Sequence, residues 1–325
     1  MKKRYFMGLV AATLITFGIV SLCSVQSALA AEKTRLSIVT AGTTGVFYIY
    51  GGAVASIVSK YAPGLDMTAE STGGSVENMK ILGKKQAALA TTSADVLYEA
   101  FHDFKNSKHF KSKVDVRALF NMYDQPHHLI TLAKSNVKSV MDVKGKRVVV
   151  GSPGSGTEVK TKMVLESLGI TYKDFTPEYL SFTEGTEALQ DNTVAAVFLG
   201  VSYPAPAVVS LALTNPIRLI PFSDSEINTI IKAYSFLSKA IIPAKTYKGQ
   251  DKDIQTVSVQ TLVVCLADLP DEVAYNIVKT VFEHKKELDQ IHSSFKETTL
   301  KNAPSTVIPL HPGAIKYFKE KKVLK

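Results

Sequence analysis

RVVVGSPGSGTE, Arg147–Glu158, is the stretch that decides the fold: an apolar run leads into a loop rich in glycine and hydroxyl residues. The β-branched run at 148–150 favours a strand, and the residues after the loop have helical spacing. A strand, a glycine loop and a helix in this order are typical of α/β sheets that bind ligands at the carboxyl ends of their strands. The stretch therefore predicts an α/β protein and raises the question of a nucleotide-binding loop.

The loop fails the test for a nucleotide-binding loop. Gly151 and Gly156 have the spacing of a P-loop, but Thr157 and Glu158 stand where that motif requires Lys and then Ser or Thr. The lysine neutralises phosphate charge, so a carboxylate beside its position repels a triphosphate. G-x-G-x-x-G is also missing after the first predicted strand, which argues against a Rossmann dinucleotide site. Nucleotide hydrolysis is therefore excluded as the expected function.

The first 30 residues have the pattern of a secretory signal peptide. Lys2–Arg4 form a basic start, residues 5–22 are almost continuously apolar, and Ala28–Ala30 supply an A-x-A cleavage site. Cleavage is predicted after Ala30, and the mature protein is expected in the periplasm. An uncleaved membrane anchor and a lipoprotein attached at Cys23 are the two alternatives.

Charge and cysteine content narrow the class of protein further. Removing the three basic residues of the signal lowers the net charge from +9 to about +6, and the remaining basic residues are scattered, so no nucleic-acid surface is expected. A positive surplus suits an anionic ligand. Cys265 is the one cysteine left in the mature chain and cannot form an internal disulfide. The roughly 295 mature residues are enough for two domains.

Apolar β-branched runs alternate with helical patterns along the mature chain, which predicts doubly wound sheets in two lobes. Two crossings, near 122–127 and 245–256, join the lobes and define lobe 1 as 31–123 plus 255–325 and lobe 2 as 124–254. The predicted strands are 36–40, 65–70, 87–90, 116–122, 127–133, 147–150, 177–181, 194–198, 217–220 and 256–267. The predicted helices are 46–61, 75–83, 94–103, 155–168, 184–190, 205–213, 270–288 and 312–321.

Four loops share one composition and one position. Each follows a predicted strand, carries Ser, Thr or Gly, and opens a helix: Ala41–Tyr48, Ser71–Asn78, Thr91–Val96 and Gly151–Glu158. Such loops present backbone N–H groups and hydroxyls at the positive end of a helix. Together they predict a cleft that holds a carboxylate or phosphate with neutral donors, without a metal or a cofactor. Taken singly, Ser75, Ser93 and Ser155 are also explained as helix N-caps.

The sequence shows no catalytic constellation. G-x-S-x-G, H-E-x-x-H and C-x-x-C are all missing. His127 and His128 are neighbours on a predicted strand and point to opposite faces, so they cannot chelate one ion together. Asp95 is interpreted as a helix cap, with a contact to a ligand amine as the alternative. We expect a binding protein and no enzyme.

The loops resemble those of a known family, the TAXI family of extracytoplasmic solute receptors that serve TRAP transporters. The resemblance covers residues 35 to 320, and its most specific motifs are STGGSVEN, GSPGSGTE and LHPGA. The other matching stretches are AGTTGVFYIYGGA, ALFNMY, DVKGKRVVV, YLSFTE and IPAKTYKGQDKDIQTVSV.

The resemblance implies a two-lobed, type II periplasmic-binding-protein-like fold that closes on its ligand. It also implies delivery to a TRAP permease with large and small subunits, which are often fused, and transport driven by an ion gradient. Small carboxylates such as glutamate, glutamine or 2-oxoglutarate are the implied ligands. The chain departs from the common G-G-T-Y-Y pattern at Gly45–Tyr48, GVFY, so a bulkier or less polar ligand is expected on that side.

The predicted cleft has donors on both lobes. Its candidate residues are Thr43, Thr44, Gly45, Tyr48, Ser75, Asn78, Thr92, Ser93, Ser155, Gly156, Thr157, Glu158 and Ser202. We expect a monomer that binds a small carboxylate. The alternative functions are the solute receptor of an ABC importer, a periplasmic sensor, and an exported enzyme. The sequence leaves the identity of the ligand open.

Overall fold

The strands form two groups, called the two series below, which are joined by two long strands. The computed structural model describes residues 33–325, so the predicted signal peptide and the lipoprotein alternative at Cys23 lie outside the described residues. Within this range the strands are β1 Thr34–Val39, β2 Leu65–Glu70, β3 Leu89–Ser93, β4 Val116–Leu132, β5 Arg147–Val149, β6 Thr176–Glu178, β7 Ala196–Gly200, β8 Ile217–Leu219, β9 Leu237–Ile242 and β10 Ile254–Leu266.

The helices connect these strands and cover them. The α-helices of the described chain are α2 Val46–Tyr61, α3 Ser75–Gly83, α4 Ala94–Phe101, α5 Gly156–Ser167, α6 Phe182–Gln190, α7 Pro206–Thr214, α8 Asp224–Ala233, α9 Asp271–Glu283, α10 Lys285–Ile291 and α11 Pro312–Glu320. Two short 3₁₀ helices are η1 Val140–Val143 and η2 Ser293–Glu297. None of the helices formed by residues 33–325 has both the length and the apolar character needed to cross a bilayer.

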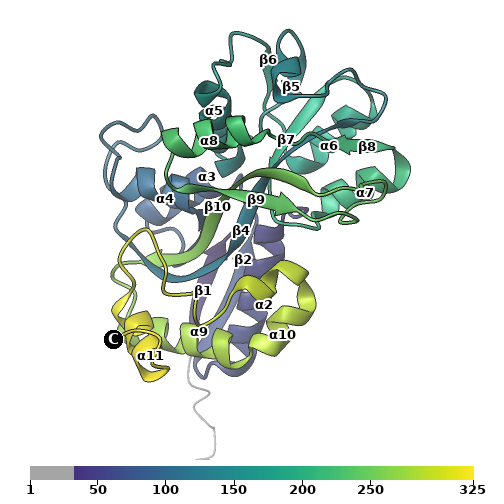
Figure 1. Cartoon of the computed structure of the whole chain (residues 1–325). Helices are drawn as coiled ribbons and strands as arrows, with labels where there is room; N and C mark the ends of the chain where they lie inside the picture. The colour runs from purple at the N-terminus through teal and green to yellow at the C-terminus, as the bar shows by residue number, and fades with distance from the viewer. Residues whose placement is uncertain (1–32) are drawn as a thin grey trace, which may run out of the picture. The chain divides into compact units, whose positions relative to one another are not determined.

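The first series consists of β1, β2 and β3, and the second consists of β5, β6 and β7. Strand β4 belongs to both series. Its first half pairs antiparallel with β10, and its second half pairs antiparallel with β7 and β8. The strand order is β2-β1-β3-β10-β4-β7-β5-β6, with β1 and β3 parallel and β5 parallel to both β6 and β7. Figure 1 shows β4 and β10 passing between the two groups of strands and helices. The α/β, mixed-sheet prediction is therefore confirmed.

Helices cover both faces of the strands, as the doubly wound prediction requires. One core cluster joins apolar residues of α2, α6, α7, α9, α10 and α11, and a second joins those of α3, α4, α5 and α8. Strand β5 shows the alternation that separates them, because Val149 belongs to the first cluster while Val148 belongs to the second. Strand β5 is therefore apolar on both sides, which explains the continuous apolar run at 148–150.

Some predicted elements were wrong. The two strands expected at 116–122 and 127–133 are one strand, β4, and the helix expected at 270–288 is divided into α9 and α10. Helix α8 and strand β9 were not predicted. The prediction of a crossing near 122–127 falls within β4, and the one near 245–256 falls at the turn between β9 and β10. The domain boundaries at 123 and 254 stay a prediction.

Candidate functional site

A pocket opens where the two series meet, at the carboxyl ends of their strands. Its cavity volume is about 310 Å³. The lining comes from the loops after β1, β2, β5, β6 and β7, together with one residue of β4: Ala41–Phe47, Ser71–Ser75, Gln125, Ser152, Ser155–Thr157, Ser181–Thr183, Gly200 and Val201. The position agrees with the rule that open α/β sheets bind ligands at this edge.

The two series touch each other around the pocket. The backbone N–H groups of Val76 and Glu77 both donate to the carbonyl oxygen of Gly154, each at 3.1 Å. On the far side, the hydroxyls of Thr44 and Thr183 lie 2.9 Å apart. These contacts close two sides of the pocket and use two of the amides at the start of α3.

The contact between the two series requires the glycines of the segment Gly151–Glu158. A Cβ on Gly156 would lie 2.7 Å from Ser93 Oγ and 2.8 Å from Ser75 Oγ, so no larger residue fits there without a shift. Gly151 has φ of +110°, a backbone conformation that L side chains rarely adopt. The loop therefore needs glycine for a close approach of the backbone to the facing series, as well as for its turn.

Helix N-termini supply the donors that remain. Gly156 and Thr157 begin α5, and their backbone N–H groups have no hydrogen-bond partner among residues 33–325. The same holds for the N–H groups of Val46 and Phe47 at the start of α2. Ser155 is the N-cap of α5, because its Oγ accepts from Glu158 N at 3.1 Å. Free amides at two helix starts favour an anion.

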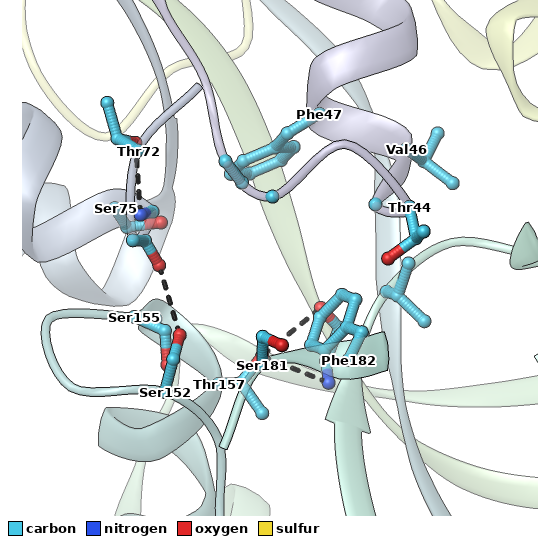
Figure 2. A pocket seen from close by; sticks show the side chains of 18 of the residues that line it. Thr44, Val46, Phe47, Thr72, Ser75, Ser152, Ser155, Thr157, Ser181 and Phe182 are labelled. Carbon is cyan, nitrogen blue, oxygen red and sulfur yellow. Dashed lines mark hydrogen bonds between the residues drawn. The ribbon is translucent and has the colours of Figure 1, made fainter. Parts of the chain in front are cut away.

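Aromatic side chains form the rest of the wall. Phe47 comes from α2 and Phe182 from α6, and Figure 2 shows both rings directed toward the same space, with Thr44 nearby. A Cβ on Gly45 would lie 3.5 Å from Phe182 Cε2, so the Phe182 ring covers the glycine of the GVFY segment. The apolar wall agrees with the less polar ligand expected from the departure at Gly45–Tyr48.

Seven of the predicted residues line the pocket: Thr43, Thr44, Gly45, Ser75, Ser155, Gly156 and Thr157. Their role in binding stays a prediction. Thr157 has a local function as well, because its Oγ1 accepts from Gly200 N at 3.2 Å and so holds the loop after β7.

Six predicted residues do not line the pocket: Tyr48, Asn78, Thr92, Ser93, Glu158 and Ser202. Asn78 is fully buried, and its amide donates to the carbonyl oxygens of Thr40 and Thr91 at 2.6 and 2.8 Å. It also accepts from Thr72 Oγ1 at 2.6 Å. Asn78 therefore joins three of the loops from behind and has no free donor for a ligand.

The positions of the other five residues outside the lining have similar local causes, and a binding role for them stays an untested prediction. Tyr48 follows Phe47 on a helix, where successive side chains are turned by about 100°. Ser93 lies behind Ser75, whose Oγ accepts from Ser93 N at 3.1 Å, and Thr92 is buried in β3 beside it.

Glu158 accepts from the hydroxyl of Tyr172 at 3.2 Å, on the side of α5 away from the pocket. That interaction and burial raise the pKa of the Tyr172 hydroxyl. Ser202 is buried, and its Oγ has no partner in the described chain, while the preceding Val201 lines the pocket.

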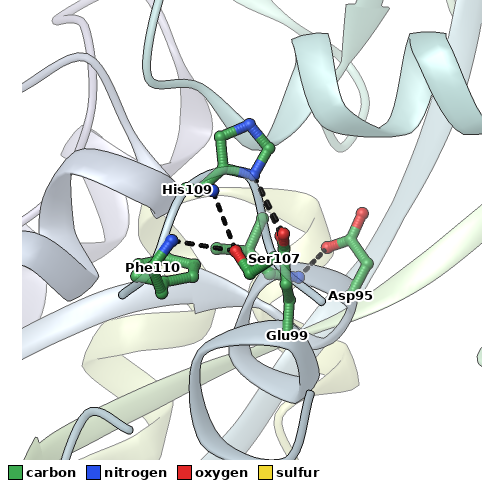
Figure 3. Close-up of polar contacts among 6 residues, drawn as sticks. Asp95, Glu99, Ser107, His109 and Phe110 are labelled. Carbon is green, nitrogen blue, oxygen red and sulfur yellow. Dashed lines mark hydrogen bonds and ion pairs between the residues drawn. The ribbon is translucent and has the colours of Figure 1, made fainter. Parts of the chain in front are cut away.

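Asp95 does not line the pocket, and it lies in the first turn of α4, whose N-cap residue is Ser93. Its Oδ1 accepts from Val96 N at 2.8 Å, so it bonds to an amide of that turn without being the N-cap residue. Figure 3 shows Asp95 and Glu99 on the same helix, with Glu99 directed at His109, at 3.1 Å. Burial acts to raise the pKa of Glu99, but the hydrogen bonds from His109 and Ser107 outweigh it, and the pKa is lowered. This network holds the polar loop after α4.

A positive charge lies behind the pocket floor, and no sequence pattern predicts it. Lys160 on α5 is fully buried, and its Nζ donates to Gln125 Oε1 at 2.9 Å. Burial lowers the pKa of Lys160 to about 8, against the attraction of Asp95 and Asp124. Because Gln125 lines the pocket and Lys160 does not, the cation lies one residue behind the cavity surface.

The two adjacent histidines are structural. His127 lies 3.2 Å from Thr161 Oγ1 and stacks on Phe198, whereas His128 lies 3.0 Å from the Tyr247 hydroxyl. Burial lowers the pKa of both, to about 4 for His128. No group of three or more His, Cys, Asp or Glu residues in the described chain is placed to hold a metal ion.

The family model of the NMT1-like family matches residues 38–321. The chain belongs to the NMT1-like family. The match spans both strand series and every loop of the pocket, so the site lies within the part of the chain that defines the family.

Solved structures similar to this NMT1-like chain have the periplasmic-binding-protein fold. A protein from Bordetella bronchiseptica RB50 matches with a TM-score of 0.54 and 16% identity, over 89% of this chain and 83% of its own. The alkanesulfonate-binding protein SsuA from Xanthomonas axonopodis pv. citri, bound to MOPS, matches with a TM-score of 0.51 and 16% identity, over 91% and 96%.

The ligand-binding component of an ABC-type import system from Staphylococcus aureus, with zinc bound, matches with a TM-score of 0.51 and 12% identity, over 80% and 78%. At these identities the similarity establishes the fold alone. The two-lobed, periplasmic-binding-protein-like fold predicted from the sequence is confirmed.

Proposed function

We propose that this protein is the solute receptor of a membrane importer and binds a small organic anion in the pocket between the two strand series. The observation that carries the proposal is the pocket itself. Backbone N–H groups without a partner among residues 33–325, at the starts of α2 and α5, belong to residues that line one cavity of about 310 Å³ from the two series. An anion bridging them binds best when the series are together, which gives ligand-driven closure a physical cause.

Glutamate, glutamine and 2-oxoglutarate are the first ligands to test, because the TAXI resemblance implies them. The neighbours of the same fold give a second group, since one of them is an alkanesulfonate-binding protein bound to MOPS. Carboxylates and sulfonates share the property that the pocket provides for: anionic oxygens that accept several hydrogen bonds from neutral donors.

Two classes of importer fit the receptor. Two solved neighbours are an alkanesulfonate-binding protein and the ligand-binding component of an ABC-type import system, and they support an ABC importer better than the TRAP system that the loop motifs imply. In either class, the receptor delivers its ligand from the periplasm to a permease. Its exported location follows from the predicted signal peptide.

Thermal unfolding with a panel of organic anions tests the proposal. A ligand at about one hundred times its Kd stabilises the folded state by roughly 2.7 kcal/mol. The protein is first unfolded and refolded, which strips any ligand bound during expression. A rise in the unfolding midpoint with at least one carboxylate or sulfonate is expected. No shift with any member of the panel would contradict the proposal.

The importer class needs a separate experiment. The receptor and a candidate permease of each class are reconstituted into liposomes, and uptake of the ligand found above is measured. Uptake that requires an inward sodium gradient identifies a TRAP system. Uptake that requires ATP inside the vesicle identifies an ABC importer.

A further inference from the structure

The lining of the pocket contains no charged side chain. Its residues are glycine, serine, threonine, one glutamine and apolar side chains. A carboxylate that could pair with a ligand ammonium is missing from the lining, as is an arginine or lysine for a second anionic group. In a site that excludes water, an unpaired ammonium loses its hydration without compensation. The lining therefore disfavours amino acids and dicarboxylates.

One charge does lie close to the cavity. Lys160 is fully buried, and its Nζ donates to Gln125 Oε1 at 2.9 Å and lies 3.4 Å from the Gln125 carbonyl oxygen. A Cβ on Gly200, another lining residue, would be 3.1 Å from Nζ. The ammonium is therefore separated from the cavity only by Gln125 and by the backbone of Gly200.

The lysine also fixes the orientation of the glutamine amide. An ammonium group has only donors, so the oxygen of Gln125 must face Lys160 and the NH₂ group must face away. Gln125 Nε2 makes no hydrogen bond with any residue in 33–325, and Gln125 lines the pocket. The amide consequently offers N–H donors to the cavity, polarised by the cation behind them.

Part of the lining is apolar. Phe47 and Phe182 are directed into the cavity, and Val46 and Val201 add to the lining (Figure 2). A ligand that fills the pocket therefore meets donors at the floor and hydrocarbon at the wall.

We propose that Lys160, acting through Gln125, makes the pocket selective for organic monoanions with an apolar body and without an ammonium group. The inference rests on the proposed receptor function and names the class of its ligand. Lys160 is a positioning residue in this account: it touches Gln125, and Gln125 touches the ligand.

Other charged or titratable groups also lie near Lys160. Asp95 on α4 and Asp124 on β4 attract its charge, and His127 on β4 is buried nearby. Asp95 is 1% exposed, and its Oδ2 has no partner in the described part of the chain. Both carboxylates attract the charge of Lys160, but neither lines the pocket, and it is the cation that bonds to the lining residue Gln125.

Four probes of matched shape test the proposal by calorimetry and thermal shift. Phenylacetate is the monoanion, phenylacetamide is its neutral isostere, L-phenylalanine adds an ammonium, and phenylmalonate adds a second carboxylate. We expect phenylacetate to bind at least tenfold more tightly than each of the others. Glutamate and 2-oxoglutarate are included as the ligands that the inference disfavours.

Two variants separate selectivity from folding. Lys160→Met conserves volume and removes a buried charge, and Gln125→Glu keeps a partner for Lys160 while placing a carboxylate in the pocket. We expect both to weaken phenylacetate binding tenfold or more. With Lys160→Met, the affinity for phenylacetamide should stay the same, so the anion-to-amide ratio collapses. A purely structural role would lower the affinities for both probes together.

The outcomes distinguish this inference from the receptor function. Tighter binding of glutamate or 2-oxoglutarate than of phenylacetate would overturn the inference and leave the receptor function standing. An unchanged anion-to-amide ratio in folded Lys160→Met would also overturn it. If none of the probes binds the wild-type protein and the wider organic-anion panel is also silent, both proposals fall.

Discussion

Adding a single methyl group at Gly156 tests the packing contact between the two series. In the structure its backbone lies against Ser75 and Ser93, two buried hydroxyl residues of the facing series. The Gly156→Ala variant adds a Cβ at 2.7 Å from Ser93 Oγ, whereas ordinary contacts begin near 3.4 Å. The series must therefore separate locally by about 0.7 Å, or the serines must move.

Neither serine can move without losing a hydrogen bond. Ser75 Oγ accepts from Ser93 N at 3.1 Å and lies 3.2 Å from Ser93 Oγ, so rotating either side chain breaks a buried hydrogen bond. Overpacking of this kind costs about 1–3 kcal/mol. The gain in helix propensity from glycine to alanine offsets about 0.5–1 kcal/mol of it. The net loss of unfolding free energy is therefore about 0–2.5 kcal/mol, with a middle value of about 1–1.5 kcal/mol.

The assay is thermal unfolding of the wild type, of Gly156→Ala and of a matched control, Gly52→Ala. A Cβ on Gly52 in α2 meets nothing within 4 Å, so the control tests helix propensity alone and is expected to be neutral or stabilising. We expect Gly156→Ala to lower the midpoint by about 2–6 °C. We also expect it to reduce the shift produced by the best organic anion of the panel. A variant as stable as the control, with an undiminished ligand shift, would refute the packing of α5 against the first series.

Three further predictions follow from single side chains. Asn78→Ala should lower the unfolding free energy by roughly 2–3 kcal/mol in urea titrations, because two buried backbone carbonyls lose their donor. Ser155→Ala should lower it by about 1 kcal/mol through loss of the N-cap, which the same titrations measure. Phe182→Ala should weaken phenylacetate binding in calorimetry with a smaller effect on stability, since Phe182 is only partly buried.

The pKa of Lys160 is near 8 in the folded protein against an ordinary value of 10.5. Between these two values the unfolded chain binds the extra proton, so the unfolding free energy should rise with pH while anion affinity falls. Lys160→Met should remove both trends. A wild-type stability that falls over this range relative to the variant would contradict the depressed pKa.

The positions of the pocket loops could be predicted from the sequence because their cause is local. Consecutive residues encode the strand, the turn rich in hydroxyl residues and glycine, and the start of the helix. Parallel strands then bring such turns to one edge of the sheet. The loop ending at Ser181 carries the same signal, a capping box completed by Glu184, but was not given a site role. A similar box at Ser223 and Glu226 marks the start of the missed helix α8.

Other features depend on contacts between distant parts of the chain. Asp124 and Pro126 interrupt the apolar pattern of β4, so one strand was predicted as two. The roles of Lys160 and Gln125 follow from a contact across 35 residues that no periodicity encodes. The side chain of Asn78 is of a type that can donate to a ligand. Only the structure shows that its amide N–H groups already donate to backbone carbonyls.

Native mass spectrometry of the protein purified from its native source tests the central claim most directly, because it measures whether a small organic anion occupies the pocket. We expect the wild type to carry a bound molecule whose mass and fragmentation identify a carboxylate or sulfonate, and Gly156→Ala to carry much less of it. A wild-type protein that is free of ligand and unaffected by any organic anion would contradict the claim. So would a bound molecule that is retained equally by both proteins.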